Sequence, residues 1–378
     1  MTPEQAGTIH VVGGGIGGLA VAGGLIHRGF DVHVHEQAPS FAHVGGGHWL
    51  YANALRALHR LGPGLADDMR VRGHGFDGFH FADPQLRTLF LESTDPYVPA
   101  PELTPVVMHR ADIIDVLQSR VPSERLHFGR RLVEARPDCL RFEDGTEVRP
   151  DLLLGADGIH SRVRPLVSDR APAFSGQTGL WGISDHVLPA GVGLHFTELW
   201  SDGLRMGFTY VGGGGVYWFM VVRDEDVPED DEARKAFVLE RATVFPPDLV
   251  AAVEKTEASA IATNPLWDMS PPPTWHTDTV CCLGDAVHPC TPNLGQGGCQ
   301  ALEDAATLVE CIEAAATAEE AFARFQRQRW WRTFAVVHLS RNLGRLAQSR
   351  GWAARLRNLL VYWGPAWIPR PVLWWICT

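Results

Sequence analysis

The sequence predicts an α/β fold in which a βαβ unit is interlocked with an antiparallel β-sheet domain and followed by C-terminal helices. Three observations support this prediction. A glycine-rich turn at 13–18 joins an apolar run to a helical pattern, short aromatic-rich strands alternate with glycine clusters between 171 and 222, and an arginine-rich helical stretch begins near residue 324. The chain has 378 residues, of which 45% are hydrophobic, so two interlocked domains can share a large core.

The first unit is expected to run strand, turn, helix and strand. Thr8–Val12 is a short apolar run, 13–18 is the glycine turn, Leu19–His27 has helical spacing, and Phe30–Glu36 alternates apolar with polar residues. This order is typical of the Rossmann type of βαβ unit.

The glycine turn satisfies a GxGxxG pattern with Gly13, Gly15 and Gly18. Glycines at these positions let backbone N–H groups approach a pyrophosphate at the positive end of the following helix. Glu36 ends the next strand, 18 residues beyond Gly18, where its carboxylate can accept hydrogen bonds from an adenosine ribose. We therefore expect a dinucleotide at this turn, and the alternative is a glycine-rich turn without a ligand.

Later elements follow from apolar spacing and turn residues. The patterns predict a helix over 112–120, strands at 140–142 and 152–154, an antiparallel sheet over 171–222, a helix over 233–241, a strand at 280–283 and a helix after residue 298. We expect a nucleotide-binding domain built from 1–72, 103–170 and 274–320, a substrate domain built from 73–102 and 171–273, and a C-terminal helical segment at 321–378.

The formal net charge of −11 argues against nucleic acid as the main partner, because phosphate binding needs a clustered positive surface. One stretch departs from this balance, since nine arginines and no acid lie between Arg324 and Arg357. We interpret it as a basic helical segment lying on an acidic body. Contact with an anionic membrane or another polyanion is the alternative.

The seven cysteines do not form the pattern of a disulfide framework, and nothing at the N-terminus resembles an export signal, so a cytoplasmic protein is expected. The tryptophan-rich tail from 359 to 376 is interrupted by glycine, prolines and an arginine, which argues against a membrane span. Peripheral contact of this tail with a membrane surface stays open. No CxxC or HExxH spacing is present, so no metal site is predicted.

Two further motifs follow apolar strands. Residues 155–164 read Gly-Ala-Asp-Gly-Ile-His-Ser-Arg-Val-Arg, and residues 284–298 read Gly-Asp-Ala-Val-His-Pro-Cys-Thr-Pro-Asn-Leu-Gly-Gln-Gly-Gly. Together with the glycine turn, these motifs resemble, in order and separation, the group A FAD-dependent aromatic monooxygenases, the para-hydroxybenzoate hydroxylase-like family with its salicylate and urate hydroxylase branch. The resemblance covers nearly the whole chain and implies a Rossmann-type FAD-binding domain.

The resemblance also implies roles for single residues. Asp285 would bind the ribityl chain of FAD, Asp157 would lie near the pyrophosphate and influence the nicotinamide reductant, and Arg110 would contact FAD. The residues expected to bind FAD are Gly13, Gly15, Ile16, Gly17, Gly18, Glu36, Gln37, Gly47, Arg110, Leu132, Asp157, Gly284, Asp285, Pro292, Gly295, Gly297 and Gly298.

The third motif carries a separate physical argument. A helix that begins near Gly298 directs its free N–H groups toward whatever lies ahead of Gly297. Such a helix end stabilises the negative charge that a reduced flavin develops at N1 and O2. The backbone from Pro292 to Gly295 is then expected to flank the flavin face where oxygen reacts, so Pro292 is also a catalytic candidate.

Three side chains are candidates for substrate contact. His48 is a candidate base for a phenol or hydroxy-heterocycle, against an ordinary packed histidine. Arg205 and Tyr217 lie where the related urate hydroxylases place a substrate-contacting arginine and tyrosine, although a structural cross-strand pair is equally consistent. Trp181 stands where many relatives carry an arginine after a tryptophan, which favours a larger, more apolar or indole-like substrate.

We expect NADH or NADPH to reduce FAD, and O₂ to add at flavin C4a to give a hydroperoxide that hydroxylates a small aromatic or heteroaromatic substrate. One alternative is an epoxidase or Baeyer-Villiger-type oxygenase on the same scaffold. Another is a flavin-binding sensor without catalysis. A monomer or homodimer is expected.

Overall fold

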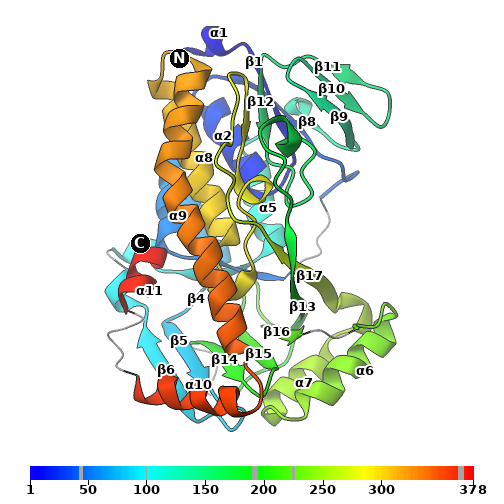
Figure 1. Cartoon of the computed structure of the whole chain (residues 1–378), viewed down its shortest axis with the longest axis vertical. Helices are drawn as coiled ribbons and strands as arrows, with labels where there is room; N and C mark the ends of the chain where they lie inside the picture. The colour runs from blue at the N-terminus through cyan, green and yellow to red at the C-terminus, as the bar shows by residue number, and fades with distance from the viewer. Residues whose placement is uncertain (42–45, 99, 190–194, 224–225, 365–369) are drawn as a thin grey trace.

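The structure is a computed structural model that describes residues 1–41, 46–98, 100–189, 195–223, 226–364 and 370–378. Within this part of the chain, four β-sheets and the helices around them form two halves, an upper and a lower one in Figure 1. The predicted α/β class is confirmed. The domain boundaries given above stay a prediction.

A five-stranded parallel sheet forms the upper half, in the order β18-β12-β1-β2-β8. Its strands are β1 Thr8–Val12, β2 Asp31–His35, β8 Leu126–His127, β12 Leu152–Gly155 and β18 Val280–Cys282. The predicted strand, turn, helix and strand unit is confirmed. Helix α2 (Ile16–His27) begins inside the glycine turn, three residues earlier than expected, because Gly15 is already its N-cap.

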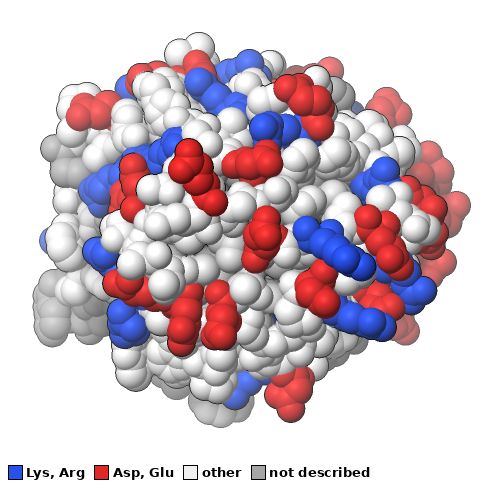
Figure 2. All heavy atoms as spheres, turned by 90° about the horizontal axis from the view of Figure 1, so that it is seen from above, with Lys and Arg blue, Asp and Glu red and all other residues white. Residues whose placement is uncertain are grey.

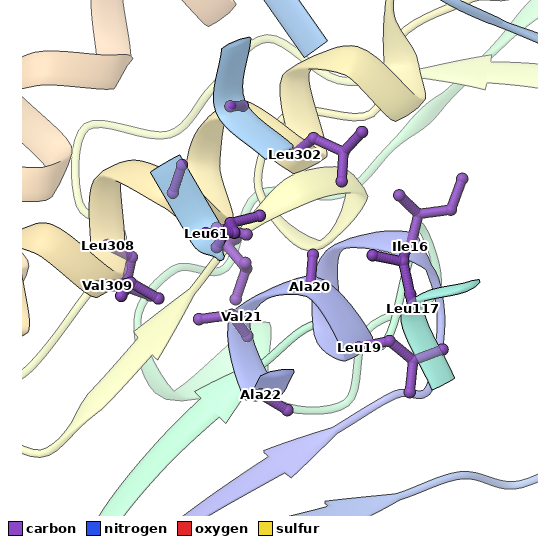
Figure 3. Packing of buried hydrophobic residues seen from close by; sticks show 14 of the residues in the cluster. Ile16, Leu19, Ala20, Val21, Ala22, Leu61, Leu117, Leu302, Leu308 and Val309 are labelled. Carbon is purple, nitrogen blue, oxygen red and sulfur yellow. The ribbon is translucent and has the colours of Figure 1, made fainter. Parts of the chain in front are cut away.

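Helix α2 is apolar on all sides and is therefore buried between the parallel sheet and other helices. It packs against α3 (Ala52–Leu61), α5 (Arg110–Gln118) and α8 (Gly297–Ala314). Figure 3 shows Leu61, Leu117 and Leu302 converging around α2 from these three helices. This packing fixes the N-terminal ends of α2 and α8 relative to each other.

A seven-stranded sheet forms the lower half, in the order β17-β13-β16-β15-β14-β5-β6. Its strands are β5 Gly78–Ala82, β6 Thr88–Ser93, β13 Ala173–Ser184, β14 Phe196–Trp200, β15 Arg205–Tyr210, β16 Val216–Arg223 and β17 Ala262–Asp268. The predicted antiparallel pairing is confirmed from β13 to β16, whereas β14 pairs with β5 in parallel. One face of this sheet packs on α6 (Asp231–Ala242) and α7 (Pro247–Lys255), and the opposite face looks toward the parallel sheet.

Two small sheets complete the β-structure. One contains β3 (Gly47–Leu50), β7 (Val106–His109) and β4 (His74–Gly75), and the other contains β9 (Leu132–Arg136), β10 (Cys139–Phe142) and β11 (Glu147–Val148). The short helix α1 (Pro3–Ala6) lies at the top of Figure 1, and α4 (Leu65–Arg72) packs against α3 and α5.

Four histidine rings stack across the parallel sheet, on β1, β2 and β8. His10, His33, His35 and His127 have neighbouring ring centroids 5.0–5.4 Å apart. Burial and the neighbouring imidazoles lower the pKa of His10 to about 4 and that of His35 to about 3. Both inner rings are therefore neutral in the folded protein at neutral pH.

The C-terminal segment is helical, as expected: α9 (Ala318–Ala347) runs beside α8, and α10 (Trp352–Trp363) and α11 (Arg370–Cys377) follow (Figure 1). Several of its arginines bind acids of the body. Arg329 pairs with Asp304 (2.6 Å), and Arg341 binds Asp268 through two hydrogen bonds of 2.7 and 2.8 Å. These contacts support the interpretation of a basic segment lying on an acidic body. In the described ranges, no helix has both the length and the apolarity needed to cross a membrane.

Candidate active site

A cavity of about 740 Å³ lies between the two halves of the molecule. Its upper part is lined by the glycine turn, the N-terminal end of α8 and the loop before it. Its lower part is lined by the upward-looking face of the seven-stranded sheet. The residues predicted to bind a cofactor or substrate that line it are Gly15, Ile16, Gly17, Gly47, His48, Arg110, Arg205, Tyr217, Gly284, Asp285, Pro292, Gly295, Gly297 and Gly298.

The three glycines of the GxGxxG turn have different surroundings. A Cβ at Gly18 would lie 1.9 Å from the carbonyl oxygen of Gly13, and Gly13 itself has a φ of +105° and lies against Ala156. A Cβ at Gly15 would meet no protein atom within 4 Å. Packing therefore requires glycine at 13 and 18, whereas the space beside Gly15 opens into the cavity and is free for a ligand.

Helices α2 and α8 begin at the cavity, and neither has a side-chain cap. The N-cap of α2 is Gly15 and that of α8 is Gln296, and neither makes a side-chain hydrogen bond to its first turn. Their first N–H groups and partial positive charges are thus available to a bound anion or to developing negative charge. The short 3-10 helix Pro292–Leu294 and Gly295 form the loop ahead of α8.

Glu36, Gln37 and Leu132 lie away from the cavity wall. The Glu36 carboxylate accepts hydrogen bonds from the backbone N–H groups of Gly14 (2.7 Å) and Ala38 (2.8 Å), so it braces the glycine turn. Gln37 is exposed, and Leu132 is buried at the start of β9. Any contact of these residues with a dinucleotide stays a prediction.

Asp157 is occupied by its own loop. Its carboxylate accepts hydrogen bonds from the Ser161 hydroxyl (2.5 Å) and from the backbone N–H groups of Arg162 (2.7 Å) and Val163 (3.2 Å). Its neighbours Ala156 and Gly158 line the cavity, and Asp157 does not. The carboxylate therefore shapes the loop that faces a ligand.

Asp285 has the opposite character. Its side chain stands open to the cavity, and within the described part of the chain its carboxylate accepts no hydrogen bond. Desolvation within the enclosing protein raises the pKa of this carboxyl group. An unpartnered carboxylate in a cavity is suited to hydroxyl donors such as those of a ribityl chain.

A buried polar network that the sequence analysis missed lies behind Asp285. Asp304 on α8 accepts hydrogen bonds from the backbone N–H of Gly284 (2.9 Å) and from Arg329 of α9 (2.6 Å), and its other contact is His288 Nε2 at 2.5 Å. Burial alone would raise the pKa of Asp304, but His288 and Arg329 outweigh it and lower the pKa to about 2. This one carboxylate holds the Gly284-Asp285 segment against α8. The sequence signal that could have revealed this network is an aspartate, Asp304, among the apolar residues of the helix after residue 298.

His48 and Arg110 meet on one side of the cavity. His48, on β3, packs against the N-terminal end of α8. A Cβ on Gly298 of that helix would be 3.6 Å from the His48 ring. Desolvation and the nearby Arg110 lower the pKa of His48 to about 4, and its Nδ1 has no hydrogen-bond partner among the described residues. The imidazole is therefore neutral and can accept a proton from a ring substituent.

Arg205, a candidate for substrate contact, already has protein partners in the structure. Its guanidinium donates to Glu198 (2.9 Å) and to Asn293 of the loop ahead of α8. Arg205 and Glu198 are 2% and 3% exposed, so this ion pair is buried. Arg205 thus links strand β15 to the loop ahead of α8. Its positive charge is already compensated by Glu198. The adjacent Glu198 was not recognised in the sequence.

The substrate side of the cavity is aromatic. Tyr217 is buried and packs against the backbone of Gly47, where a Cβ would lie 2.8 Å from its ring, and desolvation raises its pKa. Tyr217 is four strand positions from Arg205 on the same sheet face, not directly opposite it. The other aromatic side chains that line the cavity are Trp49, Tyr51, Phe79, Phe81, Trp181, Phe196, Phe219 and Trp267.

Comparisons with known proteins agree with this geometry. Residues 6–329 match the family described as FAD binding domain. The chain is 34% identical over 350 residues to an aurachin C monooxygenase/isomerase of Stigmatella aurantiaca, covering 90% of each protein. It is 36% identical over 351 residues to a 3-amino-4-hydroxybenzoate 2-monooxygenase of Streptomyces cremeus, covering 89% of this chain and 86% of that one.

The fold is also similar to solved structures. HpxO of Klebsiella pneumoniae, complexed with FAD and uric acid, superposes with a TM-score of 0.88 at 23% identity, covering 98% of this chain and 95% of that chain. The family match over most of the chain and the two relatives above 30% identity agree with the FAD-binding features of the cavity. The chain therefore belongs to the FAD binding domain family and is an FAD-dependent monooxygenase of the group A, para-hydroxybenzoate hydroxylase-like kind.

Proposed function

We propose that this enzyme uses NADH or NADPH and O₂ to hydroxylate a small aromatic or heteroaromatic ring without a carboxylate group. The observation that carries the proposal is a single cavity that joins two uncapped helix N-termini and an open aspartate to an aromatic wall. The helix N-termini and the aspartate suit a dinucleotide, and the aromatic wall suits a planar ring.

On the cofactor side, the open space at Gly15 and the first N–H groups of α2 would receive the pyrophosphate of FAD. Asp285 would accept hydrogen bonds from the ribityl hydroxyls. The N-terminal end of α8 would lie toward the flavin ring, where its partial positive charge favours the reduced, anionic form. When bound and reduced by a nicotinamide, FAD supplies the activation of O₂, of which one oxygen atom enters the ring and the other leaves as water.

On the substrate side, the protein positions the ring and excludes water. Tyr217, Trp181 and Phe219 offer aromatic surfaces for stacking or edge contacts. His48, neutral at physiological pH, would take the proton of a phenol or hydroxy-heterocycle and so raise the electron density of the ring.

The absence of a carboxylate follows from the charges in the wall. The arginines of the cavity wall are Arg110, which would contact FAD, and Arg205, which is paired with Glu198. A carboxylate on the substrate would have to compete with Glu198 for the guanidinium or stay unpaired in an apolar enclosure, which is costly. An uncharged ring is therefore favoured.

The test is anaerobic bleaching of the flavin absorbance by NADH and NADPH, with a panel of phenols, indoles, quinolones and purines, each with and without a carboxyl group. We expect one uncharged member to accelerate bleaching and to be hydroxylated once air is admitted. Acceleration by the carboxylated members alone would contradict the substrate class. An epoxide or a ring-expanded lactone would assign the alternative oxygenase chemistry, and no bleaching with any member would favour a sensor.

The finer assignments, a cytoplasmic location and a monomer or homodimer, stay part of this proposal. The location rests on the cysteine pattern of the sequence.

A further inference from the structure

Helix α10 presents an apolar face to solvent. Trp352, Leu356, Leu359, Leu360 and Trp363 are spaced i, i+4, i+7, i+8 and i+11, so they lie on one side of the helix. Their exposed fractions are 77%, 44%, 53%, 61% and 74%. We call these five residues the α10 face. Single exposed apolar residues are ordinary, but a continuous stripe along three helical turns marks an interaction surface.

The α10 face cannot turn inward, because polar contacts anchor the opposite side of the helix. Arg357 is 2% exposed and donates to the backbone carbonyls of Ser201 (3.0 Å) and Ala347, and its Nε donates to Asn358 (2.8 Å). Ala354 is buried beside it. The helix thus directs Arg357 and Ala354 toward the protein and its tryptophans and leucines outward, unlike a helix that buries its apolar face in a core.

Two exposed arginines without an acidic partner among the described residues lie beside the α10 face. No Asp or Glu occurs after Glu320 in the sequence. Arg345, in the last turn of α9, and Arg355, within α10, are exposed, and neither forms an ion pair in the part of the chain that the structure describes. The opposite end of the molecule, seen in Figure 2, carries acids and arginines intermixed. One acid from another element is near: the exposed Asp202 accepts a hydrogen bond from the backbone N–H of Gly351 at the start of α10 (2.7 Å). Among the described residues, the α10 face is therefore apolar, with two unpaired arginines at its flank and one carboxylate at its N-terminal end.

We propose that the α10 face docks on the surface of an anionic lipid bilayer, with the helix lying in the plane of the interface. Tryptophan rings and leucines would enter the boundary between headgroups and acyl chains, and Arg345 and Arg355 would contact anionic headgroups. Tyr362, which is 61% exposed, is of the type enriched at such interfaces. A symmetric contact between two copies is disfavoured, because it would bring Arg345 and Arg355 of both copies, unpaired in the described ranges, into one interface.

This inference depends only on α10 and its surroundings, so it stands or falls independently of the substrate proposed above. The first experiment is co-sedimentation of the full chain with vesicles of phosphatidylcholine alone and of equal parts phosphatidylcholine and phosphatidylglycerol. The variants are Trp352→Ala with Trp363→Ala, and Arg345→Gln with Arg355→Gln. The matched control is Trp331→Ala, which removes a tryptophan that is 71% exposed on α9. Flavin content and circular dichroism check that every variant is folded.

We expect the protein to bind the anionic vesicles and to release with added salt. The double tryptophan variant should lower the partition coefficient about tenfold or more, because each ring loses its apolar burial. The double arginine variant should lose about fivefold per charge, and only with the anionic vesicles. Trp331→Ala should bind like the unchanged protein.

Failure of the unchanged protein to bind anionic vesicles overturns the proposal, as does equal loss in the Trp331→Ala control. Analytical ultracentrifugation without lipid measures whether the protein is instead a dimer that associates through the α10 face. A dimer that dissociates in the double tryptophan variant, together with no vesicle binding, would assign the α10 face to a second copy of the chain instead.

Discussion

The two sides of the cavity use different parts of the protein. The cofactor side presents backbone, namely the glycine turn and the first turns of α2 and α8, whereas the substrate side presents aromatic side chains of the seven-stranded sheet. Backbone geometry imposes strict demands on glycine and on buried supports such as Asp304. Side chains on a sheet surface can change without altering the strands that carry them. The first side is thus fixed by folding, and the second is open to variation.

The largest effect is expected at Asp304. Asp304→Asn would break the buried pairs with His288 and Arg329 and leave Arg329 with Glu303 as its acidic partner, so the free energy of unfolding should fall by about 3–5 kcal/mol. Because the folded pKa of Asp304 is lowered to about 2, its stabilisation is present above the unfolded pKa and is lost as pH falls toward 2. Urea unfolding at neutral and acid pH measures both. Glu313→Gln, on the exposed end of α8, is the control and should change little. An equal loss in both variants would contradict the role of the network.

Substitutions of Gly15 and Gly18 should affect different properties, FAD binding at Gly15 and folding at Gly18, although both glycines belong to one motif. Gly18→Ala would push a methyl group into the Gly13 carbonyl and should destabilise the fold by at least about 1–3 kcal/mol. Gly15→Ala meets no protein atom, so stability without cofactor should be unchanged while the Kd for FAD rises about tenfold or more. Thermal unfolding of the FAD-free protein and titration with FAD give the two values. Unchanged FAD affinity in Gly15→Ala would move the ligand away from this turn.

Asp285→Ala should leave the stability of the FAD-free protein almost unchanged, since the carboxylate has no partner to lose among the described residues. FAD binding should weaken by about tenfold to a hundredfold, the value of hydrogen bonds to a charged acceptor. The flavin absorbance of the purified variant measures this directly. A fully yellow protein would show that the ribityl contact lies elsewhere.

His48→Ala tests the substrate side and should give the smallest effect on the folded enzyme. Flavin reduction should keep its rate, and hydroxylation should slow by about tenfold to a hundredfold if the imidazole takes the ring proton. Because the pKa of His48 is lowered to about 4, the unchanged enzyme should show no His48 titration between about pH 5 and pH 8. Stopped-flow measurement of the two half-reactions separates the outcomes, and equal slowing of both would assign His48 to packing.

The sequence predicted the part of the site that is built from backbone, because a local motif reflects the backbone conformation that its residues must adopt. The glycine turn, the Gly284-Asp285 segment and the start of α8 are each continuous in the chain, and the structure brings all three to one cavity. The interactions that compensate Arg205 and hold Asp304 join residues distant in sequence, such as Asn293 with Arg205 and Arg329 with Asp304. Spacing within one sequence contains no record of such pairs, so Glu198 and Asp304 were found only in the structure.

The stacked histidines of the parallel sheet make the folded protein less stable in acid, because the unfolded chain takes up protons that the folded protein does not. Since folding lowers the pKa of His10 and His35 below the ordinary value of 6.5, the unfolded chain binds more protons than the folded one between pH 6.5 and about 3. Stability therefore declines as the solution becomes more acidic than about pH 6.5. Urea unfolding of a His35→Gln variant should show a flatter decline between pH 7 and pH 5, and a parallel decline would place the acid sensitivity elsewhere. The four rings lie in the sheet that carries the glycine turn, so their titration would couple the stability of this sheet to mild acid.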